Sequence, residues 1–299
     1  MMGSLYFKSE EIEMILVIGG TGKVGSELLK QLSQKGVKAR VLVRSAQKAE
    51  TVKSLGHEPV EGDYTKPSSF EGALNGVNEL FLLTTSTNPD RWAADEIAVI
   101  DSAKKHGVKK IGLLSVLGAS PDSPINVVRV HAKVEDHLKK SGLAYTILQP
   151  TGFIQNILGQ AATIKQGAIY GNYKEGRMGF IDARDIASVA LAALTEPGHD
   201  GHTYALTGGE AVSYPEIAAM LTHLTGKTVN YVDVPTDAVV KSMTGAGFPE
   251  WMAKDLSKYG EAVAGGHTAA TTDVVEKVTK KKPITFDQFL QDHAAAFKG

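Results

Sequence analysis

One stretch near the N-terminus, residues 14–44, constrains the fold of this chain more than any other. It reads MILVIGGTGKVGSELLKQLSQKGVKARVLVR, with an unbroken apolar run at Met14–Ile18 and a second, largely apolar segment at Ala39–Val43. Such runs are typical of parallel strands that are covered on both faces. Between them lie a Gly-x-x-Gly-x-x-Gly turn and a segment with helical apolar spacing that stops at Gly36. A strand, a glycine turn, a helix and a strand within about 30 residues predict a dinucleotide-binding βαβ unit.

The glycines of this turn have distinct physical roles. The first permits a sharp turn, the second lets backbone N–H groups approach a pyrophosphate, and the third allows close packing of helix on strand. The helix N-terminus adds free N–H groups and the positive end of its dipole. Glycines also punctuate ordinary loops, so the flanking strands and helix carry the prediction. The residues expected to bind the cofactor here are Gly19, Thr21, Gly22, Lys23, Val24 and Gly25.

The end of the second apolar run indicates which cofactor is bound. Chains that bind NAD usually place Asp or Glu about 20 residues after the turn, where it holds the ribose 2′-hydroxyl. Here the run ends in Arg44 and Ser45, and no carboxylate follows until Glu50. A guanidinium binds a 2′-phosphate, which a carboxylate would repel. We therefore predict NADP(H) in preference to NAD(H), with Arg44 as the discriminating residue and Ser45 and Lys48 as helpers. The alternative is a solvated arginine that opens a surface helix.

Strand and helix patterns continue to alternate as far as Pro150. After the first two strands, further strands are expected at Glu58–Glu61, Glu79–Thr84, Val108–Leu114 and Leu143–Leu148. These six βα units predict an α/β fold with a Rossmann-type, doubly wound parallel sheet. Ligands of such sheets bind at the carboxyl ends of the strands.

Beyond Pro150 the rhythm changes. The glycine- and tyrosine-rich Gly167–Gly179 suggests a hairpin, and Asp182–Leu194 suggests a helix that returns to the sheet. A short strand at Thr203–Leu206 and a helix that Ser213 could cap belong to a smaller C-terminal α/β lobe. We divide the chain into an N-terminal extension (1–13), an NAD(P)-binding core (14–150) and a mixed segment that returns to the sheet and forms the substrate-covering lobe (151–299).

Charge and composition restrict the class of partner. The net charge is −1, which gives no electrostatic basis for binding nucleic acid or an anionic membrane, and no apolar run is long enough to span a bilayer. The chain has no cysteine, which excludes disulfides, thiolate nucleophiles and cysteine-based metal sites. No metal site is expected from the histidines either. We expect a cytoplasmic protein. Residues 1–13 lack the features of a secretory signal, and because Met14 could itself be a start residue we interpret them as an extension outside the fold.

Several further stretches resemble one known family. They read GGTGKVG, VLVR, EGDYTKPSSFEGALNGV, HAKVEDHLKKSGLAYTILQPTGFIQN and FIDARDIASVALAAL, and they span roughly Met14–Leu194. Together they are similar to the NmrA-like atypical short-chain dehydrogenases, and within that family to the triphenylmethane-dye and quinone reductases. The resemblance implies that Asp63 contacts the adenine. It also implies that the loop from Thr84 through Thr85 to Thr87 lies along the cofactor, and that the segment from Pro150 to Phe153 covers the nicotinamide.

The usual catalytic pair of short-chain dehydrogenases is missing from its expected helix. That pair is Tyr-x-x-x-Lys after the fifth strand, where the i to i+4 spacing places an ammonium beside the phenol and lowers its pKa. Aligned on Glu135, the helix has His131 in the lysine position and Val127 in the tyrosine position. A Tyr-x-x-x-Lys at Tyr170–Lys174 lies between glycines that indicate a loop or hairpin. We interpret that match as unrelated to catalysis.

Without this pair, some acceptors are favoured over others. Hydride transfer to a simple ketone gives an alkoxide, with a basicity like that of hydroxide and a pKa of about 16. Transfer to a quinone gives a phenolate-like anion with a pKa of about 10, a difference of roughly 8 kcal/mol in proton affinity. We therefore expect an NADPH-dependent reductase of small, planar, electron-poor acceptors such as quinones, azo compounds or triphenylmethane dyes.

Few polar residues are candidates for a role near the nicotinamide. His131 could orient the substrate, donate a proton or bond the nicotinamide ribose, or it could be a satisfied histidine between the domains. Ser115 follows the fifth strand, where the usual family has its serine, although a hydroxyl that caps a turn is equally consistent. Lys133 faces a different direction from His131, and is either a cofactor ligand or a solvated lysine.

Two functional classes remain open. One is the reductase described above, and the other is a redox sensor that binds NADP(H) without turnover and signals to a protein partner, as some NmrA-like proteins do. Gly152–Leu158 and Gly245–Met252 supply apolar and aromatic side chains suited to a planar ligand, which favours the enzyme, although both segments could be core. Loss of NADPH absorbance with a panel of quinones would distinguish the two classes.

Overall fold

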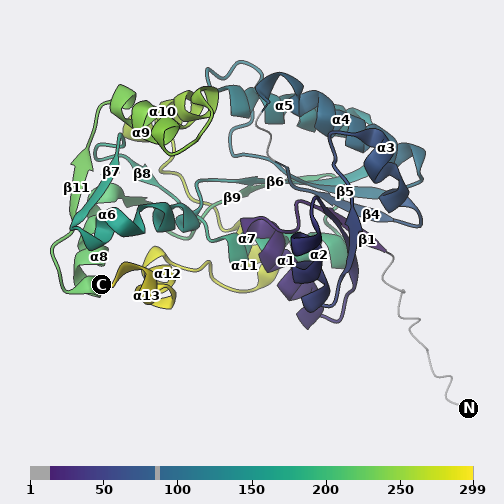
Figure 1. The fold of residues 1–299 in the computed structure, drawn as a ribbon, viewed down its shortest axis with the longest axis horizontal. Coiled ribbons are helices and arrows are strands. Elements are labelled where there is room, and N and C mark those ends of the chain that lie inside the picture. Colours follow the sequence, from purple (N-terminus) through teal and green to yellow (C-terminus); the bar gives the residue numbers. More distant parts are fainter. Residues whose placement is uncertain (1–13, 85–87, 299) are drawn as a thin grey trace, which may run out of the picture.

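The computed structural model describes residues 14–84 and 88–298, and its centre is a seven-stranded parallel sheet (Figure 1). The strand order is β3-β2-β1-β4-β5-β6-β9, and every neighbouring pair is parallel. The Rossmann-type sheet predicted from the sequence is therefore confirmed. Its strands are β1 (Ile15–Ile18), β2 (Ala39–Val43), β3 (Glu58–Glu61), β4 (Glu79–Leu82), β5 (Lys110–Leu114), β6 (Ala144–Pro150) and β9 (His202–Leu206).

Helices cover both faces of this sheet, and each face has its own apolar core (Figure 1). The helices on one face are α1 (Lys23–Gln34), α2 (Ala46–Ser54), α7 (Ala183–Thr195) and α11 (Val274–Thr279). Those on the other face are α3 (Pro67–Phe70), the 3₁₀ helix η1 (Glu71–Leu74), α4 (Pro89–Lys105) and α5 (Asn126–Lys140).

The order of the strands places the crevice for a ligand. β1 is buried along its whole length because helices cover both of its faces, as its unbroken apolar sequence predicts. The chain runs outward from β1 through β2 to β3, and then continues on the other side of β1 with β4. The connections that leave β1 and β4 therefore diverge, and ligands of such sheets bind at this reversal point.

The sheet has one strand more than the sequence predicts. β9 pairs in parallel with β6, so that Tyr204 lies opposite Leu148, and the segment expected in the C-terminal lobe instead forms the sheet edge. Its first residues, His202 and Thr203, are exposed, as an edge strand allows. The helix that leads back to it, α7, was predicted over nearly the same residues and packs on α1.

The remaining chain forms a smaller lobe beyond β9 (Figure 1). Its strands form a parallel pair and an antiparallel pair, and they are β7 (Ala168–Gly171), β8 (Arg177–Met178), β10 (Val212–Ser213) and β11 (Asn230–Asp233). Its helices are η2 (Ile154–Gln160), α6 (Ala161–Lys165), α8 (Tyr214–Thr225), α9 (Thr236–Gly245), α10 (Glu250–Ala264), α12 (Phe286–Asp292) and α13 (Ala294–Phe297). None of the helices in the described part of the chain is long and apolar enough to cross a bilayer.

The hairpin predicted for residues 167–179 is wrong. β7 pairs with β11, so that Ile169 lies opposite Tyr231, whereas β8 pairs with β10, so that Met178 lies opposite Val212. Ile169 and Met178 are both buried. A two-stranded hairpin alone buries little apolar surface, whereas separate partners cover both side chains. The predicted cap of α8 is confirmed, since the Ser213 hydroxyl accepts the N–H of the third helical residue at 3.4 Å.

Candidate functional site

The glycine turn lies directly against the end of β4. Gly19 has φ +88°, which L side chains rarely adopt, and a Cβ at this position would lie 1.8 Å from the carbonyl oxygen of Leu83. The N–H of Leu83 donates to the carbonyl of Ile18 at 3.0 Å. A Cβ on Gly25 would lie 2.3 Å from the carbonyl oxygen of Gly19, so α1 also packs closely on the turn. The turn therefore requires glycine at both positions.

The N-terminus of α1 has the properties of an anion site. Gly22 precedes the helix and has no side chain to bond the N–H groups of the first turn, which contains no acidic residue. Lys23 Nζ donates to Asn156 Oδ1 of η2 at 2.8 Å, and burial lowers the pKa of Lys23. Thr21 is half-buried and Val24 is buried. Free N–H groups and the helix dipole favour a pyrophosphate here, so the residues present fit a dinucleotide.

Arg44 is exposed just beyond the end of β2, at the same edge of the sheet as the turn. Its charge acts on Asp63, which follows β3. Burial alone would raise the pKa of Asp63, but hydrogen bonds from the backbone and hydroxyl of Thr65, together with nearby cations that include Arg44, hold it below its usual value. Ser45 caps α2 by accepting the N–H of Lys48 at 3.4 Å. This edge thus presents an exposed guanidinium beside an ionised carboxylate.

The segment that the resemblance places over the nicotinamide leaves the sheet at the end of β6. Pro150 is the last residue of that strand and is buried, and its carbonyl accepts the N–H of Leu117 at 2.9 Å. Phe153 is half-buried, precedes η2 and forms a single parallel bridge with Ile181. The bond from Lys23 to η2 brings this segment beside the glycine turn.

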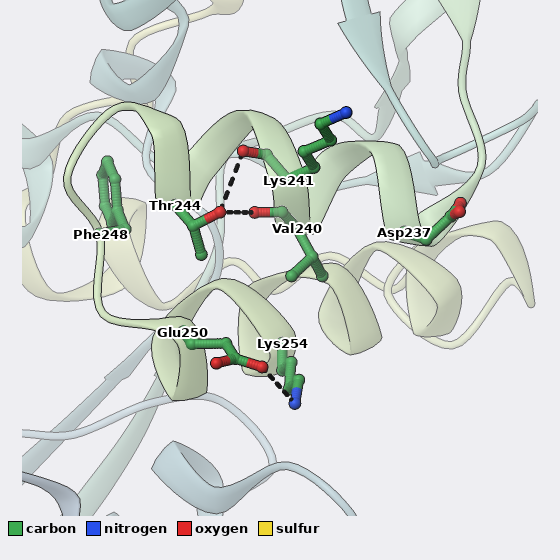
Figure 2. Close-up of a pocket in the computed structure, with 7 residues that line it drawn as sticks. All are labelled: Asp237, Val240, Lys241, Thr244, Phe248, Glu250 and Lys254. Carbon is green, nitrogen blue, oxygen red and sulfur yellow. Dashed lines mark hydrogen bonds and ion pairs between the residues drawn. The ribbon is translucent and has the colours of Figure 1, made fainter.

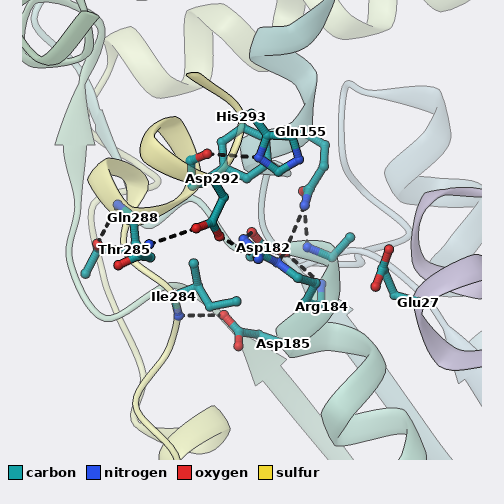
Figure 3. Close-up of polar contacts among 12 residues, drawn as sticks. Glu27, Gln155, Asp182, Arg184, Asp185, Ile284, Thr285, Gln288, Asp292 and His293 are labelled. Carbon is teal, nitrogen blue, oxygen red and sulfur yellow. Dashed lines mark hydrogen bonds and ion pairs between the residues drawn. The ribbon is translucent and has the colours of Figure 1, made fainter. Parts of the chain in front are cut away.

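A buried aspartate anchors the same segment to two other helices (Figure 3). Asp182 is 0% exposed, and its carboxylate accepts Gln155 Nε2 of η2 at 2.8 Å. It also accepts Arg184 Nε at 3.0 Å and Nη2 at 2.8 Å, while Nη1 of the same guanidinium donates to Asp292 of α12 at 2.7 Å. These bonds join η2, α7 and α12 at one point, so the segment after β6 is held on both sides.

His131 lies on the buried face of α5 and is 7% exposed. Its ring meets Trp92 of α4 edge to face, with centroids 5.3 Å apart, and Trp92 meets Trp251 of α10 at 6.4 Å. Burial lowers the pKa of His131 to about 4, although the charge of Glu135 opposes this shift. Among the described residues, none bonds Nδ1 of this ring. The imidazole is therefore neutral at pH 7 and can form hydrogen bonds, but it is not a cationic acid.

Ser115 lies beside the same helix but is bonded to another residue. It is buried just beyond β5, and its hydroxyl donates to Glu135 Oε1 at 2.5 Å. Gln149 Nε2 donates to the same oxygen at 2.8 Å, and Lys139 Nζ donates to Oε2 at 3.1 Å. Glu135 follows His131 by one helical turn, so His131 and the partner of Ser115 lie on the same face of α5, the one that covers the sheet.

The other candidates occupy separate environments. Lys133 is exposed, and because it lies two residues beyond His131 it points to the opposite side of α5. Thr84 is half-buried after β4, where its hydroxyl donates to Glu96 of α4. Thr85 lies outside the described residues. The roles assigned to all these residues from the sequence stay predictions.

The Tyr-x-x-x-Lys match of the C-terminal half is not helical. Tyr170 is 44% exposed in β7, and Lys174 lies in the turn that follows, with φ +47°. The two side chains therefore do not share a helix face. This placement agrees with our interpretation that the match is coincidental.

The segment Gly245–Met252, which we expected to supply a planar-ligand surface, divides between two environments. Trp251 packs toward Trp92 and so contributes to the surroundings of His131. Phe248 instead is 44% exposed and lines a hollow of about 590 Å³ between α9 and α10 (Figure 2). Five of the seven residues that line the hollow are polar or charged, and they are Asp237, Lys241, Thr244, Glu250 and Lys254.

Comparisons with known proteins agree with this geometry. The sequence pattern described as the NmrA-like family matches residues 11–290. The chain belongs to this family. It is 38% identical over 285 residues to the NAD(P)H azoreductase of Xenophilus azovorans, a match that covers 95% of this chain and 99% of the relative.

Two solved structures support the same placement of this NmrA-like chain. The NADPH-dependent quinone oxidoreductase of Escherichia coli in complex with NADPH superimposes with a TM-score of 0.84 at 27% identity, over 94% of this chain and 99% of the other. The Citrobacter triphenylmethane reductase complexed with NADP(H) superimposes with a TM-score of 0.82 at 26% identity, over 93% and 99%.

Sequence reasoning missed several residues that organise the site of this NmrA-like protein. Two of them carried a local signal: Glu135 lies at i+4 from His131, and Asp182 immediately precedes an apolar helix in the position of a cap. Others have partners far along the chain, and no local pattern reveals them. They are Asn156, which bonds a residue 133 positions away, and Asp255, whose partners are 128 and 129 positions away.

Proposed function

We propose that this protein is an NADPH-dependent reductase that delivers hydride to electron-poor conjugated acceptors of the quinone, azo or triphenylmethane-dye type. The observation that carries the proposal is the neutral, buried His131, which lies among aromatic side chains on the helix where the usual family has its tyrosine and lysine. The oxidoreductase class expected from the sequence agrees with the names of the relatives, which act on an azo compound, a quinone or a dye.

The glycine turn and the start of α1 would hold the pyrophosphate of the cofactor. Gly19 and Gly25 allow backbone N–H groups to approach the phosphates, and Lys23 adds a cation at the same helix end. Asp63 would contact the adenine, and Arg44 would bind the 2′-phosphate, which supports NADPH in preference to NADH. When bound, NADPH supplies the hydride.

The remaining side chains suit acceptors that stabilise their own negative charge. His131 at neutral pH can donate one N–H hydrogen bond to an acceptor oxygen or nitrogen, and it has no proton of high acidity to give. Ser115 donates to Glu135, whose same oxygen also accepts from Gln149, rather than to His131. A phenolate-like product needs only the hydrogen bond, whereas an alkoxide would need a positioned acid.

Steady-state loss of NADPH absorbance tests this proposal directly. The acceptors would be a quinone, an azo dye, a cationic triphenylmethane dye and a simple aliphatic ketone. We expect turnover with at least one of the first three and none above background with the ketone. Rapid reduction of the ketone without reduction of the quinone would overturn the proposal. Tight binding of NADPH with no turnover on any acceptor would instead favour the redox-sensor function.

A further inference from the structure

Thr84 connects the glycine turn to a buried polar cluster on α4. It follows Leu83, whose carbonyl oxygen lies where a Cβ on Gly19 would be, so Thr84 lies at the crevice between β1 and β4. Its hydroxyl donates to Glu96 Oε1. The indole Nε1 of Trp92 donates to the Thr84 hydroxyl at 3.2 Å and to the same carboxyl oxygen at 3.1 Å. A change in the charge of Glu96 can therefore affect the edge of the sheet at the glycine turn through the side chain of Thr84 alone.

Glu96 has surroundings that suit a neutral carboxyl. Its side chain is 0% exposed, and burial raises its pKa to about 7, although the hydrogen bonds from Thr84 and Trp92 oppose this shift. Both donors converge on Oε1, and within residues 14–84 and 88–298 no hydrogen-bond partner is found for Oε2. A neutral carboxyl can accept both bonds at its carbonyl oxygen, whereas a carboxylate here would be buried without a cation.

We propose that Glu96 is a positioning residue for the cofactor: it fixes the Thr84 hydroxyl at the end of β4, and it takes up a proton when the anionic cofactor binds beside it. This inference rests on the proposed function, because it requires NADPH to bind at the glycine turn. Phosphates near a buried carboxyl disfavour the carboxylate, as like charges do. NADPH therefore binds the neutral form of Glu96 more tightly than the ionised form.

The other titratable groups around the cluster do not account for such a linkage. Tyr64 hydrogen-bonds Thr84, and burial raises its pKa from an already high value. His131 packs on the same indole, and its lowered pKa keeps it neutral. Asp95, the preceding residue of α4, is paired with an arginine of its own helix at 3.0 Å. Glu96 is the member of the cluster whose charge changes near neutral pH.

The Kd for NADPH, measured by fluorescence titration of the full chain from about pH 6 to about pH 9, tests the proposal. In Glu96→Gln an amide oxygen still accepts from Thr84 and Trp92, but the side chain cannot ionise. For wild type we expect the Kd to increase above pH 7, by up to about tenfold per pH unit for one linked proton. Glu96→Gln should lack this added slope and bind NADPH several-fold more tightly than wild type at the alkaline end. The 2′-phosphate of NADPH has a pKa of about 6. Its ionisation changes the Kd of wild type and of Glu96→Gln in the same way, so it does not affect the difference between their pH slopes.

Two further variants separate the effect of the Glu96 proton on NADPH binding from the effect of the hydrogen bonds that Glu96 accepts. Asp185→Asn is the matched control, since Asp185 on α7 is another buried carboxyl, with a pKa raised to about 6 by burial, and it should keep the wild-type pH profile. Glu96→Ala removes the acceptor and should weaken NADPH binding at pH ~6, where Glu96→Gln should bind like wild type. Because glutamine fills the same space as glutamate and keeps the acceptor oxygen, this rescue reports the position of the side chain, whereas the pH slope reports its proton.

The outcomes distinguish the inference from the function on which it rests. If wild type binds NADPH and Glu96→Gln shows the same pH slope, the inference is overturned while the proposed function stands. If wild type does not bind NADPH at any pH, both fail. If Glu96→Ala does not fold, the slope difference between wild type and Glu96→Gln still decides the proton linkage.

Discussion

The N-termini of α1 and α5 both lack a capping side chain of their own, and the protein completes them in opposite ways. α1 begins after Gly22 and leaves its first N–H groups at the carboxyl edge of the sheet. α5 begins after Ile125, and the N–H groups of Asn126 and Val127 donate at 3.1 and 2.9 Å to the two carboxylate oxygens of Asp255 on α10. The second helix end is thus filled by the protein itself.

The N-terminus of α1 is therefore the candidate ligand site, whereas the N-terminus of α5 is a contact between the two lobes. The Asp255 carboxylate accepts the first two free N–H groups of α5 and complements its dipole, so a second anion would be repelled there. The same docking carries Trp251, one turn before Asp255, onto Trp92 beside His131. The lobe helix that caps α5 therefore also completes the surroundings of the candidate catalytic histidine.

The largest effect is expected from Gly19→Ala, which breaks the anion site at α1. The new methyl would meet the Leu83 oxygen at 1.8 Å, in addition to the strain of a positive φ, so the turn must move. We expect NADPH affinity to fall by about 100-fold or more, which corresponds to about 2.7 kcal/mol. Fluorescence titration would measure the loss of affinity, and urea unfolding would measure the loss of stability.

Gly36→Ala is the control for this experiment. Gly36 has φ +74° but no atom within 4 Å of an added Cβ. It should lose about 1–2 kcal/mol of unfolding free energy from backbone strain alone and keep its NADPH affinity. Equal loss of affinity in both variants would contradict the close-approach argument.

Arg44→Ala should have a smaller and more selective effect on the same site. Charge-assisted hydrogen bonds are worth about 1.5–3 kcal/mol, so NADPH affinity should fall by roughly 10- to 100-fold while NADH affinity stays unchanged. Lys38→Ala is the matched control, because Lys38 is an exposed cation at the opposite end of β2. If Arg44→Ala weakened both cofactors equally, Arg44 would not be the residue that recognises the 2′-phosphate.

The smallest effect is expected from Asp255→Ala, which tests the other member of the comparison. Loss of this cap should cost about 1–2 kcal/mol of unfolding free energy, measured by urea denaturation. Asp255→Asn should cost less, because its amide oxygen still accepts one of the two N–H groups. NADPH affinity should remain within about twofold in both variants. A large loss of cofactor binding with unchanged stability would contradict the structural role that we assign to this helix end.

The features that could be predicted are those with short-range signals. The turn around Gly19, the cap at Ser213 and the parallel strands follow from patterns within a few residues of one another. The hairpin at 167–179 could not be judged in this way, because the partners of Ile169 and Met178 lie in strands that come much later in the chain. The neutrality of His131 likewise depends on its burial, to which other elements such as α4 with Trp92 contribute, and the sequence of α5 does not contain them.

The sequence by itself determined the βαβ unit, the parallel sheet and the edge at which a dinucleotide would bind. These features depend on the spacing of apolar residues and on the positions of glycines, which are properties of short stretches of the chain. Tertiary structure decided which buried groups keep or lose their charge and which helix ends are filled. Burial of Glu96 and His131 and the long-range bonds of Asp255 depend on how helices pack on the sheet. Desolvation and hydrogen bonding depend on neighbours in space, and a linear pattern does not contain them.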